Sequence, residues 1–210
     1  MKGNALETVS ARQFWNSRYD REDYLFGEAP NAFLTGQVAL LKAGMNALAV
    51  ADGEGRNGVW LAQMGLTVTT TDIAPRAVHK ALALAARRGV SIDARLADLD
   101  QWTWPQGAYD VVVAIFIQFA PPAARQRLFA QMKAAVRSGG LILLQGYRPE
   151  QLAYGTGGPA QIENLYTEAL LREAFADFDI LHLESHDSDV SEGSGHHGRS
   201  ALIDLVARRQ

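Results

Sequence analysis

Strand-length runs that are apolar, β-branched or apolar on one face alternate along this chain with segments that have the period of a helix. The runs lie at residues 47–51, 66–71, 91–96, 109–117 and 141–145. Between them, Val78, Ala81, Leu82 and Ala85 are spaced i, i+3, i+4 and i+7, which predicts one buried helix face. The run at 109–117 is continuously apolar after Asp110, as expected for a central parallel strand. This alternation predicts an α/β fold with an open, mostly parallel sheet joined by right-handed crossovers.

The last third of the chain departs from that alternation. Residues 146–160 are rich in glycine and proline and predict a long loop, of the kind that is usually functional or mobile. A helix is expected at 166–175, with Thr167 as its cap. Two final strands are expected at 178–183 and 200–206, with a polar loop at 184–198 between them.

Residues 1–44 precede the first strand and contain no clear strand pattern of their own. Helices are predicted at 11–19, with Ser10 as N-cap, and at 31–42, closed by Gly44. This leader holds the aromatic residues Phe14, Trp15, Tyr19, Tyr24, Phe26 and Phe33. They either pin the leader onto the rest of the chain or form a lid in which Trp15, Arg18 and Tyr19 cover a ligand. We therefore expect a helical, aromatic lid at 1–44 and the main domain at 45–210.

A glycine turn follows the first apolar run and marks the predicted ligand site. Asp52-Gly53-Glu54-Gly55 stops the run abruptly, and an amphipathic helix follows it. Glycines permit a tight turn and close approach to a ligand, and the free N–H groups of the helix start face the same way. The spacing Gly53-x-Gly55-x-x-Gly58 also satisfies the dinucleotide-binding pattern.

Two acids at later strand ends refine the prediction. Asp72 closes the second strand, nineteen residues after Gly53, where an acid can accept two hydrogen bonds from ribose hydroxyls. The alternative role for Asp72 is to cap the helix that begins near Pro75. Asp98 follows the third strand, and an acid placed there to accept from an adenine amine favours S-adenosylmethionine over a nicotinamide cofactor.

Composition narrows the classes of protein and of binding partner that fit this chain. The chain has 210 residues, 48% of them hydrophobic, a formal net charge of −3 and no cysteine. These values predict a globular protein without disulfides or thiolate ligands, and they give no electrostatic reason to expect nucleic acid or an anionic membrane as a partner. No apolar run reaches membrane-spanning length and no signal-peptide core follows the first residues, so we expect a cytoplasmic protein.

Histidines cluster in the polar loop between the last two strands. If the first of these strands is parallel to the others, the loop emerges at the carboxyl edge of the sheet, where such folds bind ligands. That geometry would bring Glu192, His196, His197 and Arg199 near the cofactor. A solvated loop is the alternative. No regular ligand set accompanies the histidine pair, so no metal site is predicted.

Several short motifs together resemble one family. They are Tyr24-x-x-Gly27-x-x-Pro30-Asn31, Gly53-Glu-Gly-Arg-Asn57, Asp72, Asp98, Ser138-Gly-Gly140, Gly157-Gly-Pro159 and Glu192-Gly-x-x-His196-x-Gly198. In order and spacing, they resemble Rossmann-like (class I) S-adenosylmethionine-dependent methyltransferases, and more narrowly the small bacterial tellurite-resistance and thiopurine methyltransferase group. Two positions depart from the family. Ala51 stands where an acid is usual, the nearest acid being Asp52, and Gln118 stands where relatives often have a histidine.

The resemblance implies a fold, a cofactor and a set of site residues. It implies a seven-stranded sheet whose last strand is antiparallel, with helices on both faces, and S-adenosyl-L-methionine as cofactor. The residues expected to bind that cofactor are Trp15, Arg18, Tyr19, Asp52, Gly53, Gly55, Asn57, Asp72, Ile73, Asp98, Leu99 and Ile115.

The expected reaction is direct transfer of the sulfonium methyl group to a small, soft or anionic acceptor, such as a thiol or a selenium or tellurium oxyanion. His196, Arg199 and Arg148 are the candidates for binding that acceptor. Two alternatives stay open: a nicotinamide-dependent oxidoreductase and a catalytically silent S-adenosylmethionine-binding protein. A monomer or homodimer without nucleic-acid or membrane partners is expected, and the sequence does not identify the acceptor.

Overall fold

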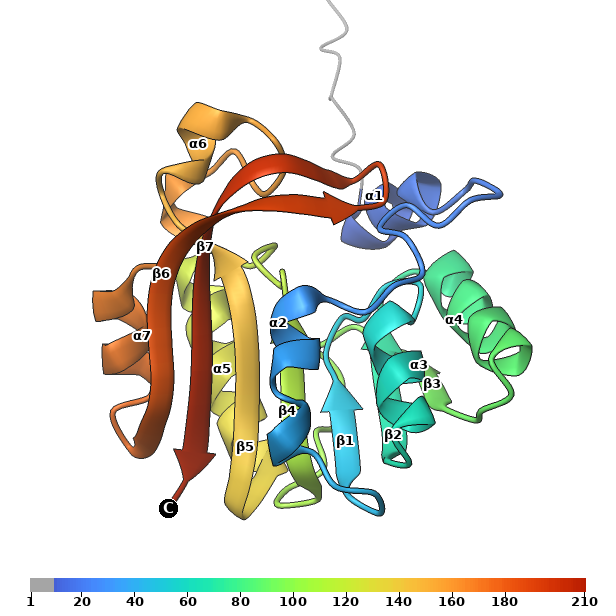
Figure 1. Ribbon diagram of the computed structural model, residues 1–210, viewed down its shortest axis with the longest axis horizontal. Helices are drawn as coiled ribbons and strands as arrows, with labels where there is room; N and C mark the ends of the chain where they lie inside the picture. Colours follow the sequence, from blue (N-terminus) through green and yellow to red (C-terminus); the bar gives the residue numbers. More distant parts are fainter. Residues whose placement is uncertain (1–9) are drawn as a thin grey trace, which may run out of the picture.

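The computed structural model describes residues 10–210 and contains one seven-stranded sheet (Figure 1). Its strand order is β3-β2-β1-β4-β5-β7-β6, and β7 runs antiparallel to both of its neighbours while the other strands are parallel to one another. The strands are β1 (Asn46–Ala49), β2 (Thr67–Asp72), β3 (Asp93–Leu96), β4 (Tyr109–Ile115), β5 (Val136–Tyr147), β6 (Phe178–Glu192) and β7 (His196–Arg209). The fold class expected from the sequence is confirmed.

Two hydrophobic layers sandwich the sheet. On one face, Phe33 and Leu34 of α2 and Leu61 of α3 pack against alternating residues of β1, β2, β4 and β5. On the other face, Phe129 of α5 and Phe175, the C-cap residue of α7, pack against the opposite side of β4, β5 and β7. The helices are α1 (Ala11–Arg18), α2 (Ala32–Gly36), α3 (Arg56–Gln63), α4 (Pro75–Arg87), α5 (Pro122–Ala135), α6 (Gln151–Tyr154) and α7 (Glu168–Ala174), with the 3₁₀ turns η1 (Val38–Leu40) and η2 (Ile162–Asn164).

The β6–β7 hairpin is much longer than predicted. Its strands have 15 and 14 residues, and its far half bends over the carboxyl edge of the sheet towards α1 (Figure 1). The polar loop expected at 184–198 is instead a paired ribbon that runs from Glu184↔Asp204 to Glu192↔His196. Its sequence lacks an apolar face because most of this ribbon leaves the core and covers the site rather than packing on a helix.

Three other expectations need correction. The helix predicted at 31–42 is the short α2 followed by η1, and the chain leaves helical geometry at Gln37 between them. Residues 138–140, expected to lead into a strand, already belong to β5. The loop expected at 146–160 begins with the last residues of β5 and contains the one-turn helix α6. The expected caps Ser10 and Thr167 are confirmed, since each accepts a hydrogen bond from the backbone of its helix.

Between residues 10 and 210, no helix combines the length and the hydrophobicity that a membrane crossing requires.

Candidate functional site

The glycine turn after β1 is built from three alternate residues in the left-handed region. Ala51, Gly53 and Gly55 have φ values of 48°, 60° and 90°. Glycine adopts these angles without steric cost, whereas alanine does not. Gly55 also has no room for a side chain, because a Cβ atom there would lie 2.6 Å from the Cβ of Ala81 in α4. The turn therefore starts two residues before its first glycine and brings α3 and α4 together.

Asp52 lies within this turn and serves the start of α3. Its Oδ2 accepts a hydrogen bond of 2.9 Å from the backbone N–H of Gly58. A Cβ atom on Gly58 would lie 2.7 Å from that oxygen, so the glycine leaves the space that the carboxylate fills. Burial raises the pKa of Asp52 to about 7. Asp52, one of the expected cofactor-binding residues, thus uses its carboxylate to bind a backbone N–H group of α3.

Asp72 and Asp98 end neighbouring strands of the sheet. Asp72 is buried, and its two oxygens accept hydrogen bonds from Gly53 N–H (3.0 Å) and Ala74 N–H (2.8 Å). Burial raises its pKa to about 6. The helix-cap position before α4 is Ala74 and not Asp72, so the carboxylate ties the glycine turn to the strand end instead. Asp98 is exposed and accepts one hydrogen bond, from the N–H of Asp100.

Four more of the residues expected to bind the cofactor lie around the carboxyl edge of the sheet. Ile73 and Leu99 are half-buried beside Asp72 and Asp98. Ile115 ends β4 inside the hydrophobic layer under α2 and α3. Asn57 is buried, and its Oδ1 accepts a hydrogen bond of 3.0 Å from the N–H of Asn31. Asn57 therefore joins α3 to the leader.

The leader covers the glycine turn with an aromatic side chain. Tyr19 is only 4% exposed, and its hydroxyl would lie 2.8 Å from a Cβ atom built on Gly53. Burial raises the pKa of Tyr19 well above its usual value, and Asp72 and Glu54 act in the same direction. Trp15 stacks on Tyr19 with ring centroids 5.9 Å apart, and the guanidinium of Arg18 lies over Trp15 at 5.3 Å. The three residues expected in a lid thus lie together above the turn.

Glu54 is a buried acid within the same turn. It is 3% exposed and forms an ion pair with Lys80 of α4. Its Oε2 has no hydrogen-bond partner within residues 10–210. A buried carboxylate oxygen in this position would be satisfied by a donor from a ligand, such as an ammonium group. Together with the acceptors on Asp72 and Asp98, the donor-and-acceptor set fits a ligand that has amine, ribose and adenine parts.

Two motifs that lie far apart in the sequence interlock above the sheet. The backbone N–H of Gly195, in the hairpin turn, donates a hydrogen bond of 2.9 Å to the carbonyl of Leu25. A Cβ atom on Gly193 would lie 2.4 Å from the backbone nitrogen of Gly27. The contact therefore requires glycine in the hairpin, and it closes the leader and the hairpin tip over the carboxyl edge. We call this contact of residues 25–27 with 193–195 the leader–hairpin clasp.

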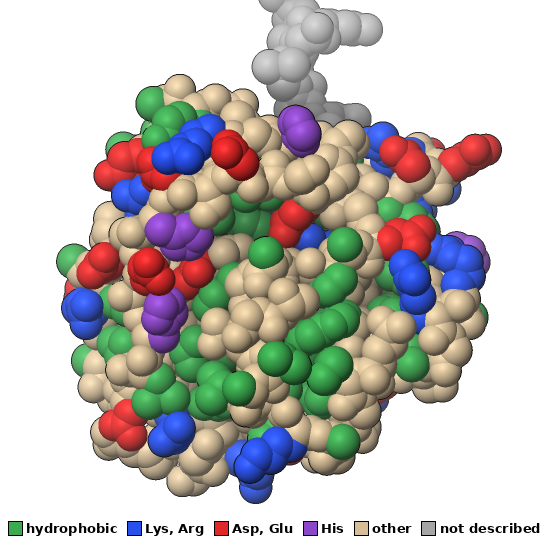
Figure 2. Space-filling view, in the orientation of Figure 1, with side chains coloured by type: hydrophobic (Ala, Val, Ile, Leu, Met, Phe, Trp, Pro, Cys, Tyr) green, Lys and Arg blue, Asp and Glu red, His purple; other side chains and the backbone are tan. Residues whose placement is uncertain are grey.

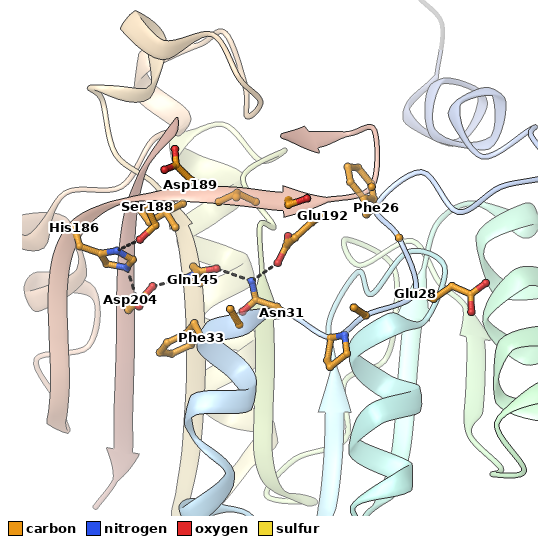
Figure 3. Close-up of a pocket in the computed structure, with 18 residues that line it drawn as sticks. Phe26, Glu28, Asn31, Phe33, Gln145, His186, Ser188, Asp189, Glu192 and Asp204 are labelled. Carbon is orange, nitrogen blue, oxygen red and sulfur yellow. Dashed lines mark hydrogen bonds and ion pairs between the residues drawn. The ribbon is translucent and has the colours of Figure 1, made fainter. Parts of the chain in front are cut away.

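A chain of buried polar side chains supports the clasp from below (Figure 3). Glu192 forms an ion pair with Arg56 at 2.6 Å and accepts a hydrogen bond of 2.9 Å from Nδ2 of Asn31. Asn31 also donates to Gln145 (2.7 Å), whose own Nε2 donates to Asp204 (2.7 Å). His186 and Asp204 are 3.0 Å apart at the end of the chain. Apart from Arg56, these groups line a cavity of about 320 Å³ between the hairpin, Phe33 and the segment 26–32.

His196 lies beside Glu192 in an aromatic enclosure. Its ring centroid is 4.4 Å from that of Phe26, 4.5 Å from Phe116 and 5.8 Å from Tyr147. His196 is 8% exposed, and burial lowers its pKa. Phe116, just after β4, is held at a φ of 56° and stacks on Tyr147. We call Phe26, Phe116, Tyr147 and His196 the aromatic enclosure.

The two arginines expected beside the acceptor share a partner elsewhere. Arg148 forms ion pairs with Asp187 and Glu150. Arg199, which is more than half exposed, lies 3.6 Å from the other oxygen of Asp187. The structure thus brings these two cations to one carboxylate of the hairpin, and His196 to the aromatic enclosure. His197 is exposed on the opposite side of β7 from His196.

In the described part of the chain, no group of three or more histidine, aspartate or glutamate side chains is arranged to hold a metal ion.

Several site residues were missed by the sequence reasoning. Arg56 and Asn31 lay in quoted motifs but were given no role, and no pattern in the sequence shows that they meet Glu192, which was itself expected near the cofactor. Tyr147 follows a buried strand and is indistinguishable there from a core residue. Phe116 could have been found only through its backbone conformation, which is rare for an aromatic residue.

Comparisons with known proteins agree with this architecture. Residues 47–140 match the sequence model of a methyltransferase domain. An uncharacterised protein of Mycobacterium tuberculosis, Rv1403c, is 31% identical over 111 residues, which is 52% of this chain and 40% of that protein. A second match, in Mycobacterium bovis, has the same identity and coverage. The chain therefore spans less than half the length of the curated relatives that it matches.

Solved structures share the fold at low sequence identity. One comes from work on the conversion of a disulfide bond into a thioacetal group during echinomycin biosynthesis, with a TM-score of 0.78, 18% identity, and coverage of 96% of this chain and 92% of that one. Magnesium protoporphyrin IX methyltransferase from Synechocystis, solved with bound S-adenosylhomocysteine, has a TM-score of 0.72, 18% identity and coverage of 95% and 97%. TehB from Haemophilus influenzae has a TM-score of 0.70, 16% identity and coverage of 95% and 67%.

Proposed function

We propose that this chain, which carries a Rossmann-like (class I) methyltransferase domain, is an S-adenosylmethionine-dependent methyltransferase that acts on a small-molecule acceptor. The single observation that carries the proposal is the arrangement at the carboxyl edge of β1, β2 and β3. The glycine turn, Asp72 and Asp98 follow three adjacent strands there, in the order in which an adenosine-containing ligand would need them.

The cofactor proposal is supported by how the residues fit its parts. Asp72 would accept from the ribose hydroxyls and Asp98 from the adenine amine, while the unpartnered oxygen of Glu54 suits the ammonium group of the amino-acid end. Methyltransferase structures with this fold, one of them with bound S-adenosylhomocysteine, support the same cofactor. When bound, the cofactor supplies an electrophilic methyl group. The chain's own residues position that group and exclude water from it.

A small acceptor is supported by the enclosure of the site. The leader–hairpin clasp and the aromatic enclosure close the space above β4 and β5, which suits a compact molecule better than a polymer. On the face shown in Figure 2, lysine and arginine side chains are scattered among acidic ones and form no continuous basic surface. The segment 1–44, of which residues 1–9 lie outside the described part of the chain, would act as the lid over the cofactor, and residues 45–210 as the catalytic domain.

The acceptor type is proposed to be soft, as for a thiol or a selenium or tellurium compound. Aromatic faces surround the neutral imidazole of His196, and such groups favour polarisable atoms over strongly hydrated anions. Arg148 and Arg199 could hold an anionic acceptor only in competition with Asp187. This geometry favours the thiol-like members of the expected group.

Calorimetry followed by an acceptor screen tests the proposal. S-adenosylmethionine and S-adenosylhomocysteine should bind with micromolar dissociation constants, and NAD should not bind. Methyl-labelled cofactor is then incubated separately with thiols, selenite, tellurite, tRNA and lysate protein, and label should enter small molecules only. Binding of NAD alone would indicate an oxidoreductase. Cofactor binding without turnover of any acceptor would indicate a silent binding protein.

A further inference from the structure

His196 has the surroundings of a base whose tautomer is fixed. Its Nδ1 lies 3.4 Å from Oε2 of Glu192, at the base of the hairpin turn. Glu192 is held in place, because Arg56 binds the same oxygen. Asn31 binds the other oxygen (Figure 3). A carboxylate beside one imidazole nitrogen keeps the proton on that nitrogen, so the other nitrogen, Nε2, presents a lone pair.

Burial keeps the imidazole of His196 uncharged, although the neighbouring carboxylate of Glu192 acts in the opposite direction. The groups that face it are the carboxylate of Glu192, the guanidinium groups of Arg56 and Arg18, and the phenol of Tyr147. The pKa of Glu192 is lowered to about 2 by His196 and Arg56, against the effect of its burial, so it is ionised at neutral pH. Burial lowers the pKa of His196. The imidazole is therefore uncharged at neutral pH and free to accept a proton.

A buried hydroxyl without a protein partner lies close to this imidazole. Tyr147 is 1% exposed, and its hydroxyl has no hydrogen-bond partner among the residues that the structure describes. A Cβ atom built on Gly157 would lie 3.0 Å from that hydroxyl and 3.4 Å from Cδ2 of His196, the ring carbon bonded to Nε2. The Tyr147 hydroxyl and the His196 ring thus lie against the same backbone position, and glycine there keeps a side chain away from both.

Resting on the proposed function, we infer that His196 is the general base of the methyl transfer, that Glu192 positions it, and that the acceptor is a protonated thiol-type group held between His196 and the Tyr147 hydroxyl. The acceptor sulfur forms the new bond to the methyl carbon. The bond between that carbon and the sulfonium sulfur breaks, and its electron pair stays on the departing sulfur. The thiol proton passes to Nε2 of His196 and from there to solvent.

This assignment separates thiols from oxyanions within the proposed acceptor group. A thiol must lose a proton when it is methylated, whereas selenite or tellurite offers a lone pair without needing a base. A Glu–His pair has a chemical task only in the first case. The orphaned phenol can donate a hydrogen bond to the sulfur and so hold it in line.

Two thiols of different acidity distinguish a base from a structural histidine. The first is 2-mercaptoethanol, which is protonated at pH 7, and the second is 4-nitrothiophenol, which is already ionised. His196→Gln should lower kcat for 2-mercaptoethanol roughly 100-fold or more, because general bases contribute about that much, and should have little effect with 4-nitrothiophenol. Equal losses with both thiols would overturn the base assignment. Tyr147→Phe should raise KM for both thiols and keep the fold, since the hydroxyl has no protein partner.

A nitrogen NMR measurement tests the Glu192–His196 pair without turnover. In the cofactor-free protein, the His196 proton should reside on Nδ1, and Glu192→Gln should shift the population towards the other tautomer. A proton on Nε2 in the wild type would overturn the inference. If selenite or tellurite is methylated and no thiol is, the inference fails while the proposed function stands. If neither cofactor nor acceptor binds, the proposed function fails, and the inference that rests on it is overturned too, whichever tautomer the spectrum shows.

Discussion

Glu192 at the hairpin tip lies 2.6 Å from Arg56 at the start of α3, although 136 residues separate them in sequence. Both side chains are largely buried, at 12% and 7% exposure. The pair joins the last ribbon of the sheet to the helix that follows the glycine turn. It therefore links the two halves of the site through one ionic contact.

Breaking this pair should destabilise the protein strongly. Arg56→Met leaves Glu192 buried without its cation, and loss of one partner of a buried ion pair costs about 3–5 kcal/mol. Urea denaturation should report that fall in the free energy of unfolding. Arg95→Ala is the control, because its pair with Asp93 is exposed and should contribute nothing measurable. Equal stability of both variants would show that the Arg56–Glu192 pair is not a structural contact.

The leader–hairpin clasp should depend on the missing side chain of Gly193. Gly193→Ala places a Cβ atom against the backbone of Leu25 and Gly27, at φ 62°. Gly155→Ala is a matched control, since its φ is 63° and no atom lies within 4 Å of its Cβ position. Amide exchange across residues 10–33 should become faster in the first variant only. Similar exchange in both variants would attribute the effect to backbone strain alone.

Asp98 offers a cleaner test of the cofactor site than Asp72. Asp98 is exposed, so Asp98→Ala should weaken S-adenosylhomocysteine binding about tenfold without lowering the melting temperature. Asp72→Ala should weaken binding about ten- to hundredfold and also destabilise the fold, because the buried carboxylate holds Gly53 and Ala74. Calorimetry and thermal unfolding measure the two effects separately. Unchanged affinity in Asp98→Ala would remove that residue from the site.

Stability should fall with rising pH because of Asp52. Its pKa is raised from 3.8 to about 7 in the folded state, so the folded protein binds a proton that the unfolded chain has already released. The contribution of Asp52 is therefore greatest below pH 4 and declines up to about pH 7. Asp52→Asn keeps an oxygen for Gly58 and removes the titration. Its free energy of unfolding relative to wild type should be higher at pH 8 than at pH 5 by at least about 1 kcal/mol. A difference that does not vary with pH would contradict this.

Ala51 is an alanine in a conformation that glycine prefers. Left-handed geometry costs an L-residue roughly 1–2 kcal/mol, and glycine loses roughly 0.5–1 kcal/mol through its greater freedom when unfolded. Ala51→Gly should therefore stabilise the fold by up to about 1 kcal/mol, measured by urea denaturation. Ala49→Gly in β1 is the opposite control and should be destabilising. A marked loss of stability in Ala51→Gly would mean that the methyl group packs usefully.

The sheet could be predicted from the sequence because the apolar pattern of each strand follows from its burial in the fold. The run at 109–117 is apolar throughout since β4 is buried on both faces, and Asp72 and Asp98 mark strand ends by their position alone. The hairpin could not be predicted, because residues 184–192 are Ser, Asp and Glu apart from His186 and Val190, so they have no apolar face and low strand propensity. Its stability comes from the ladder with β7 and from contacts with the leader, which are distant in sequence.

The candidate site divides in the same way. Gly53, Gly55, Asp72 and Asp98 follow from strand ends and turn chemistry, and the structure places them at one edge. The meeting of Asn31, Arg56 and Glu192 depends on how three elements pack, and the grouping of Arg148 with Arg199 on Asp187 depends on hairpin register. Neither arrangement leaves a local pattern in the sequence.

The leader–hairpin clasp and the Asn31–Glu192 hydrogen bond beneath it also bear on the order in which the protein folds during synthesis. Asn31 emerges from the ribosome early, and its partner Glu192 follows 161 residues later. Contacts of such high sequence separation form late in folding, because a long loop must be closed before they contribute any stability. The glycine turn and its strands can assemble while synthesis continues. The leader and the hairpin cannot close over them until the hairpin has been made. A chain stopped before the hairpin would expose Phe26 and Phe116 to solvent, so an incomplete product should be prone to aggregation.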